Sequence, residues 1–346
     1  MSESDLPAKP GADTATRTAG LLAVLSYLVT AGVMAFCGWL AYVASTLEGF
    51  DKYALYGFAL VLFGMALATG PRLGLLYAEH NVVQRESAPA LYALADQIAD
   101  ELGTRRVWRF EVSAEFNANY RMIWFRRRPV ITLGYPLWNL LTAQERVALL
   151  AHELAHGANG DPRRSALIGP SLDGLVQGAD QLSIPLDDTD SEFMVVLAIL
   201  WHPIRWLLTF PMLALMAAQD RLLLRSSRRA ELYADHLAAR VAGAAALVSL
   251  LRKTHLGDRA VDDLLAAVRR EDDDVWAAQL VCLEGLDEVV IGDEDSTDST
   301  HPSTRERIDA VAGREYGPAV VEGEDELDGE LAEQLPAVLT ELRDAA

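Results

Sequence analysis

The feature that most restricts the fold of this chain is a His-Glu-x-x-His sequence that runs from His152 to His156. If this stretch is helical, both imidazoles lie on one face, one turn apart, where they can bind the same metal ion. Glu153 then lies close enough to act as a base towards a water molecule at that ion. A catalytic zinc site has three protein ligands and one open position, so the fold must bring a further ligand to this helix.

The residues around the motif predict a helix. Thr142 and Glu145 have the spacing of a capping box, in which the two residues satisfy each other's backbone N–H groups. The helix is expected to end near Gly157 or Gly160. An apolar stripe at helical spacing supports the assignment and consists of Val147, Leu150 and Leu154. This context separates the motif from the matches that arise by chance in ordinary chains.

The best candidate for the third ligand is Glu231, at the start of a second predicted helix that ends near Gly243. Asp235 is four residues further on and shares a face with Glu231. It can accept a hydrogen bond from a ligand histidine, which would hold that ring in one tautomer. The alternative is an amphipathic helix whose acidic residues are simply solvated, and these residues alone leave that alternative open.

Three motifs, in this order, resemble those of the integral-membrane zinc peptidases of the M48 family. They are His152–His156 followed by Asn159-Gly160-Asp161, the stretch Arg229–Asp235, and the stretch His301–Ile308. The resemblance extends over residues 21–308 and is closer to the heat-shock membrane protease HtpX than to the CAAX prenyl proteases. It implies a mainly α fold with a small β-sheet (α+β), in which a gluzincin-type peptidase domain is attached to an N-terminal transmembrane helical hairpin.

The resemblance implies one Zn²⁺ per chain, bound by His152, His156 and Glu231, with Glu153 as the general base. It also implies that His301 and Arg307 stabilise the developing oxyanion, or that Arg307 positions that histidine. Asp235 would orient a ligand, with His152 the first choice. The sequence alone also allows His301 to be an ordinary surface residue in an acidic loop.

A predicted edge strand supplies the expected substrate contacts. Residues 107–112 and 130–133 are rich in β-forming side chains, and residues 119–125 lie between them. In related zinc peptidases an edge strand beside the metal pairs with extended substrate, which here suits residues 119–125. Asn117-Ala118 resembles the Asn-Ala pair that the family has just before such strands, so the expected substrate contacts are Asn117, Ala118 and Asn119. A hairpin that only covers the metal-binding helix is the alternative.

Two apolar runs predict a membrane location. Residues 21–44 carry no charge, and at about 1.5 Å per residue they exceed the roughly 30 Å hydrocarbon core; residues 53–69 are at the short end of what can span it. Basic residues flank the outer ends of both runs, namely Lys9, Arg17, Arg72 and Arg85. The positive-inside rule therefore predicts a multi-pass protein of the plasma membrane whose catalytic site faces the cytoplasm.

The predicted domains are a flexible tail (1–18), the transmembrane hairpin (19–70), the peptidase domain (71–316) and an acidic tail (317–346). A membrane-associated insertion, residues 165–225, interrupts the peptidase domain.

The two helices that supply the zinc ligands must lie on the same side of the membrane. The chain between them therefore crosses the membrane an even number of times. Residues 193–218 form one apolar run, interrupted by Pro203 and Arg205, and an arginine within a span is costly. We expect a re-entrant or interfacial helical pair broken near Pro203, with a four-span arrangement as the alternative.

Composition narrows the function further. The formal net charge of −20 disfavours nucleic acid as a partner, and two cysteines imply neither a disulfide framework nor a cysteine zinc site.

The expected function is a zinc-dependent endopeptidase whose partners are the lipid bilayer and polypeptides, such as misfolded or membrane proteins in quality control. The alternatives are a zinc-binding pseudoprotease or scaffold, a CAAX-type prenyl protease and a zinc transporter.

Overall fold

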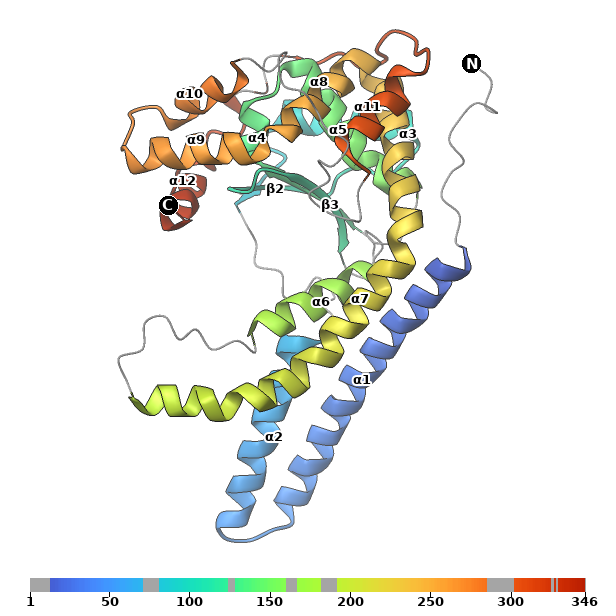
Figure 1. Ribbon diagram of the computed structural model, residues 1–346. Helices are drawn as coiled ribbons and strands as arrows, with labels where there is room; N and C mark the ends of the chain where they lie inside the picture. The colour runs from blue at the N-terminus through green and yellow to red at the C-terminus, as the bar shows by residue number, and fades with distance from the viewer. Residues whose placement is uncertain are drawn as a thin grey trace. The chain divides into compact units, whose positions relative to one another are not determined.

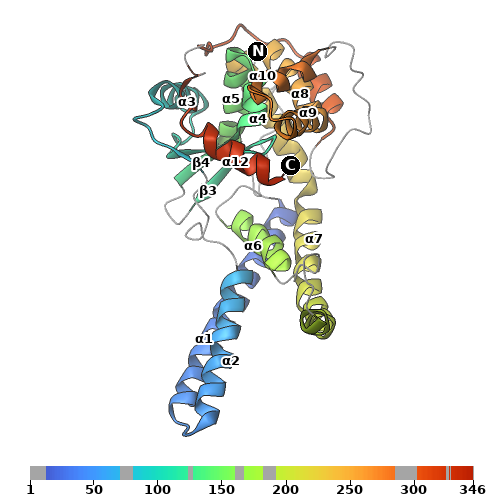
Figure 2. The same cartoon turned by 90° about the vertical axis from the view of Figure 1, so that its left-hand side faces the viewer.

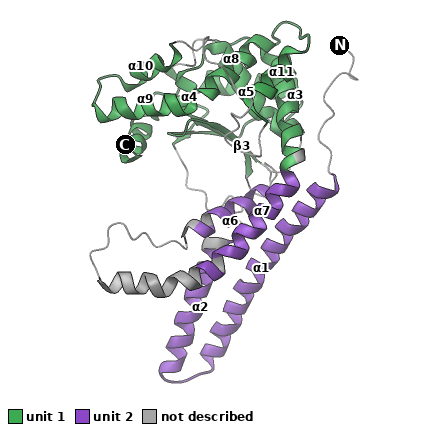
Figure 3. Ribbon diagram, in the orientation of Figure 1, with its two compact units in different colours: residues 1–11, 78–165, 224–346 green, residues 12–77, 166–223 purple. Residues whose placement is uncertain are grey.

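The structure is a computed structural model that describes residues 13–70, 81–123, 128–159, 167–181, 192–284, 302–324, 327 and 329–345. Helices predominate, and one small mixed sheet accompanies them, as the predicted α+β class requires (Figure 1). The chain divides into two compact units (Figure 3). Unit 1 comprises residues 1–11, 78–165 and 224–346, and unit 2 comprises residues 12–77 and 166–223.

Unit 2 contains a hairpin of two long apolar helices, α1 (Thr14–Ser45) and α2 (Phe50–Thr69), which lie side by side in both views (Figures 1 and 2). Both are long and apolar enough to cross a membrane, and few of their residues are buried within the protein. Among the described residues they are the only helices with these properties. They give weak support to membrane attachment.

The third element of unit 2 is α6 (Ile168–Gln181), which packs against α1 and α2. The buried hydroxyls of Ser26 on α1 and Ser171 on α6 lie 2.9 Å apart.

The long helix α7 (Glu192–Ala242) contributes to both units, with residues up to Leu223 in unit 2 and the remainder in unit 1. The sequence predicts a helical pair broken near Pro203, and this prediction is wrong, because α7 is one helix of 51 residues that includes Pro203 and Pro211. A proline removes one backbone hydrogen bond and commonly bends a helix without ending it, provided that the neighbouring turns are stabilised.

Unit 1 is built on a four-stranded sheet with the strand order β1-β2-β4-β3. Its strands are β1 (Val82–Val83), β2 (Arg109–Ser113), β3 (Ala118–Ile123) and β4 (Arg128–Gly134). Strands β2 and β4 are parallel, while β3 is antiparallel to β4 and forms one edge. Strand β1 is followed by the helix α3 (Pro89–Leu102).

The two faces of the sheet differ in polarity. One face is apolar and joins the main core of unit 1, together with α3 and α5 (Ala143–Asn159); its buried residues are Phe110, Val112, Ala118, Tyr120, Ile131 and Leu133. The opposite face contains two cross-strand rows, one formed by Arg109, Val130 and Arg121, the other by Glu111, Thr132 and Asn119. This alternation follows from the period of two in a strand.

The remaining helices complete unit 1. They are α4 (Tyr135–Asn139), α8 (Ala244–His255), α9 (Gly257–Arg269), α10 (Val275–Gln279) with the 3₁₀ turn η2 (Leu280–Leu283), α11 (Thr304–Ala312) and α12 (Leu335–Ala345).

Much of the stretch that the sequence predicts to be an acidic tail packs into the core of unit 1 and does not lie apart from it. Its apolar side chains lie in the main core, namely Val321, Leu327, Leu331, Val338 and Leu342. The carboxylate of Glu330 accepts hydrogen bonds from the backbone N–H groups of Ala90 and Leu91, at 2.8 and 2.7 Å. These N–H groups begin α3, which has no cap from its own preceding side chain, so a distant carboxylate caps that helix.

A buried polar network connects the start of α5 to α8. The capping box is present, since the Thr142 N–H donates to Glu145 at 2.7 Å and the Glu145 N–H donates to Thr142 at 3.4 Å. Glu145 also accepts from Lys253 at 2.7 Å and from Ser249 at 2.5 Å. Burial alone would raise the pKa of Glu145, but these hydrogen bonds and the Lys253 charge lower it below its usual value.

We predict that Glu145→Gln destabilises unit 1 by about 3–5 kcal/mol, because it leaves the Lys253 ammonium buried without a counter-charge. The melting temperature in detergent should fall on the order of 5–10 °C. The folded protein holds the Glu145 pKa below its unfolded value. The stabilisation is therefore complete above about pH 4.3 and is lost as the pH falls through the lower folded pKa.

The control is the double variant Glu145→Gln with Lys253→Met. It should lose less stability than the sum of the two single variants, because neither charge is then buried alone. Strict additivity of the three melting temperatures would contradict this account.

Candidate metal centre

The helix that contains the His-Glu-x-x-His sequence, α5, is bonded to the C-terminal part of α7 at both ends. The Asn159 side chain at the end of α5 donates to the Ala230 carbonyl at 3.0 Å. At the start of α5, the Gln144 side chain donates to the Ala242 carbonyl at 2.8 Å. The two segments therefore run antiparallel, and residues 152–156 face residues 231–235. Asn159 belonged to the motif noted in the sequence, whereas no sequence signal indicated Gln144.

Three potential ligand atoms meet between these helices. The Nε2 atoms of His152 and His156 lie 3.3 Å apart, and the Glu231 oxygens lie 3.4 Å from the first and 3.5 Å from the second. All three residues are buried, each at most 7% exposed. They are the one group of histidine, cysteine or acidic side chains suited to a metal ion that is found among the described residues.

These separations fit a tetrahedral zinc ion. Bonds of about 2.0–2.1 Å at tetrahedral angles place neighbouring ligand atoms roughly 3.3 Å apart. The three observed distances lie within a few tenths of an ångström of that value. Two imidazoles and one carboxylate are also the donor set of several catalytic zinc sites, which leave the fourth position open. The residues present therefore fit zinc.

Asp235 and Arg307 extend the site beyond the ligand atoms. An Asp235 oxygen lies 3.0 Å from Nδ1 of His152, and Arg307 on α11 donates two hydrogen bonds of 2.7 Å to the same carboxylate. Burial would raise the pKa of Asp235, but the charge and hydrogen bonds of Arg307 lower it to about 2. Asp235 is therefore an anion at neutral pH, and the Arg307 guanidinium is directed at it.

The site attracts positive charge. Burial lowers the pKa of His152, but its hydrogen bonds with Asp235 and Glu231 have the opposite effect and raise that pKa to about 9. The two carboxylates thus stabilise a cation between the helices. A metal ion also supplies positive charge, and it competes with the proton for the imidazole nitrogen.

Glu153, the predicted general base, is held by the edge strand of the sheet. Its Oε2 accepts a hydrogen bond of 2.8 Å from the backbone N–H of Tyr120, in the middle of β3. The Tyr120 side chain packs against α5, where a Cβ atom at Gly157 would come within 2.6 Å of its hydroxyl oxygen. Gly157 thus permits close packing inside α5, which ends at Asn159 and not at Gly157. No motif or spacing in the sequence indicated the contact between Tyr120 and Glu153.

The other predicted residues are distributed as follows. Asn117 directly precedes β3 and accepts from the Ala118 N–H through its own side chain, at 2.8 Å. Asn117 and Asn119 are exposed, and Ala118 is buried. The structure therefore brings this stretch to a sheet edge whose middle contacts Glu153. His301, Gly160 and Asp161 lie outside the described residues.

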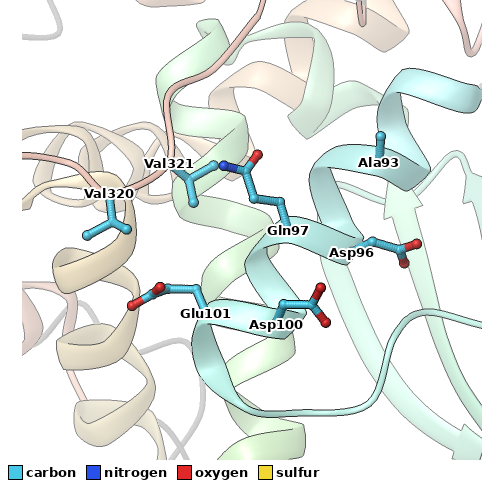
Figure 4. Close-up of a pocket in the computed structure, with 7 residues that line it drawn as sticks. All are labelled: Ala93, Asp96, Gln97, Asp100, Glu101, Val320 and Val321. Atoms are coloured by element: carbon cyan, nitrogen blue, oxygen red, sulfur yellow. The ribbon is translucent and has the colours of Figure 1, made fainter.

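One open cavity of about 670 Å³ lies apart from this cluster (Figure 4). It lies between α3 and the C-terminal segment, and it is lined by Ala93, Asp96, Gln97, Asp100, Glu101, Val320 and Val321. None of these residues is a candidate ligand, and each of the acidic ones has an arginine within 4.0 Å. The cavity therefore has no part in the metal site.

We predict that Asp235→Asn weakens zinc binding by about 10–100-fold, because the amide cannot hold the His152 tautomer or balance Arg307 as a carboxylate does. Competition with a chromogenic chelator measures this affinity. Glu306→Gln is the control, because Glu306 is an exposed carboxylate on α11 that pairs with Arg228. Equal zinc affinities for both variants would contradict an orienting role for Asp235.

Comparison with known proteins agrees with this geometry. The model of peptidase family M48 matches residues 87–315, roughly two thirds of the chain, and the match includes all three candidate ligands. The chain matches no curated protein and no solved structure. Peptidases of this family depend on zinc and act on polypeptides. On the strength of the family match, the chain belongs to peptidase family M48.

Proposed function

We propose that this chain is a membrane-bound zinc endopeptidase in which Glu153 is the general base. The observation that carries the proposal is the meeting of three buried ligand atoms, 3.3–3.5 Å apart, next to a glutamate of fixed orientation. The family match supplies the chemical class independently of this geometry.

Each residue of the cluster has a chemical part in this proposal. His152, His156 and Glu231 would hold the zinc ion. When bound, zinc acidifies a water molecule and polarises the scissile carbonyl. Glu153 accepts a proton at its carboxylate and then donates it to the leaving amine. The hydrogen bond from the Tyr120 N–H restricts the Glu153 side chain to one orientation, which reduces the entropy lost on reaching the transition state.

Arg307 and Asp235 are positioning residues in this proposal. Arg307 fixes the Asp235 carboxylate by two hydrogen bonds, and Asp235 in turn fixes the ring of His152. This arrangement favours the positioning alternative for Arg307 over direct contact with the oxyanion. The role of His301 in oxyanion stabilisation rests on the family resemblance.

The proposed substrate is an extended polypeptide that lies along β3, near Asn117, Ala118 and Asn119. An edge strand can pair with a peptide backbone with little dependence on side chains. Such pairing suits cleavage of misfolded or membrane proteins, as in HtpX-type quality control, better than recognition of a prenylated C-terminus. The helices α1 and α2 would place the enzyme in the plasma membrane with its site towards the cytoplasm.

A zinc-binding pseudoprotease or scaffold is the second candidate. It shares the ligand set, so metal content does not distinguish it from a peptidase. The position of Glu153 favours the enzyme, because a structural zinc site needs no base beside an open coordination position. A zinc transporter would need ligands within the membrane-spanning helices, and the ligand cluster belongs to unit 1, not to α1 or α2.

We predict that Glu153→Gln retains about one zinc ion per chain and loses at least about a hundredfold in turnover, because the amide cannot accept the proton. The measurement compares casein cleavage and zinc content of the detergent-purified variant with those of the wild type. A chelator should abolish wild-type cleavage, and added zinc should restore it.

The matched control is Glu101→Gln, an exposed carboxylate on α3 remote from the ligands, which should leave both quantities unchanged. Full activity of Glu153→Gln would exclude Glu153 as the base. Zinc binding by the wild type without cleavage of casein or of a membrane protein would instead favour the scaffold.

A further inference from the structure

Residues 114–117, which we call the strand-entry loop, connect β2 to the proposed substrate strand β3. The last residue of this loop, Asn117, is exposed and accepts a hydrogen bond of 2.8 Å from the N–H of Ala118. Asn117 and Ala118 are also the first residues expected to contact substrate. The position of the strand-entry loop therefore decides where those contacts lie.

The backbone directions in β3 show which groups an added peptide strand would meet. The Gly134 N–H donates to the Asn117 carbonyl at 2.7 Å, so that carbonyl points towards β4. The Tyr120 N–H donates to Glu153 and so points away from β4. Backbone groups alternate in direction along an antiparallel strand, so the Ala118 carbonyl faces the same outer edge as the Tyr120 N–H. A peptide that joins the sheet would pair at this edge.

A glycine lets the strand-entry loop lie close against the end of β4. A Cβ atom at Gly134 would overlap the carbonyl oxygens of Glu115 and Asn117. Such an overlap lies far inside van der Waals contact, so a side chain at this position would displace the loop. The end of β4 thus restricts the loop on one side.

Phe116 holds the loop from a second side. Its ring packs against the main core and against a small cluster formed by Leu140, Ala260 and Cys282. A Cβ atom at Gly257, the first residue of α9, would come within 3.2 Å of this ring. The missing side chain at Gly257 leaves room for the ring, which joins the residue before Asn117 to α9.

Glu341, on α12, holds the start of the loop. Its carboxylate accepts a hydrogen bond of 3.2 Å from the Ala114 N–H and one of 3.1 Å from the Asn81 side chain. The Asn81 amide also donates to the Val112 carbonyl on β2, at 3.2 Å. Hydrogen bonds to an ionised acceptor are stronger than those between neutral groups. Glu341 lies beyond the residues that the M48 family model matches, so this support comes from the C-terminal segment.

We propose that Phe116 and Glu341 are positioning residues that fix the strand-entry loop and so align an extended peptide along β3. This inference rests on the proposed function, because it needs β3 to be the substrate strand. The two side chains act on the strand and not on the zinc ligands. Their loss should therefore weaken substrate binding and leave the chemical step nearly unchanged.

The test measures cleavage of fluorescein-labelled casein by the full chain in detergent. We expect Phe116→Ala and Glu341→Ala each to raise KM about three- to tenfold, because a contact that orders the loop is lost. The kcat should change by less than about twofold, and zinc content should be unchanged. Fluorescence anisotropy of the same casein with Glu153→Gln measures binding without cleavage, and adding either alanine substitution should weaken that binding by the same factor.

Conservative variants and a matched control separate positioning from general damage. Glu341→Gln keeps an oxygen that can accept from the Ala114 N–H, so its KM should lie within about twofold of the wild type. Phe116→Leu keeps an apolar side chain, and its KM should lie between those of the wild type and Phe116→Ala. The control is Asp344→Ala, which removes an exposed carboxylate from the same helix, α12, and should leave KM and kcat unchanged.

Two results would overturn the proposal while the peptidase assignment stands. An unchanged KM and casein affinity in either alanine variant removes that residue from the positioning role. A kcat that falls in proportion to the folded or zinc-loaded fraction, with KM unchanged, shows that the side chain only stabilises the fold. Melting temperature and zinc content measure these two fractions.

Failure of the proposed function gives a different pattern. A wild type that binds zinc and casein but does not cleave casein excludes the peptidase. Casein binding that still depends on Phe116 and Glu341 would then support their positioning role in a peptide-binding strand. A wild type that neither cleaves nor binds casein would overturn both proposals.

Discussion

The antiparallel contact between α5 and the end of α7 is the interaction on which the site depends. Two of the candidate ligands come from α5 and the third comes from α7, so a shift of either helix along the other would separate the ligand atoms. Asn159 and Gln144 join the two helices at opposite ends through backbone carbonyls of α7. Because these bonds lie on both sides of the ligands, they resist sliding as well as separation, which is how a fold holds a metal site ready before the metal binds.

Charge is balanced within this contact by elements that lie far apart in the chain. Glu231 and Asp235 are buried carboxylates on one helix, and two such anions would repel each other without a cation between or beside them. Arg307 on α11 supplies one cation, and zinc or a proton on the imidazoles supplies the other. The site therefore favours a positively charged partner, and a bound metal ion would contribute directly to the stability of this part of the fold.

The residues that follow the part of the chain matched by the M48 family model contribute more to the packing of unit 1 than their acidic composition implies. The stretch after residue 315 is acidic, yet its apolar side chains join the main core, and the Glu330 carboxylate caps α3. The N–H of Gly323 donates to the Gln144 side chain, the same amide that binds the end of α7. The C-terminal segment thus supports the junction of the two ligand helices, although it supplies no ligand.

The sequence by itself determined the parts of the site that depend on local spacing. The His152 and His156 pair, the Thr142 and Glu145 capping box, and the Glu231 and Asp235 pair follow from the 3.6-residue period of a helix. Tertiary structure alone decided the contact of Tyr120 with Glu153, the pairing of Arg307 with Asp235, the continuity of α7 through Pro203 and the burial of the C-terminal segment. Some of these features join groups that are distant in sequence, and others depend on packing that overrides a local conformational preference. Neither kind of feature leaves a periodic signal in the sequence.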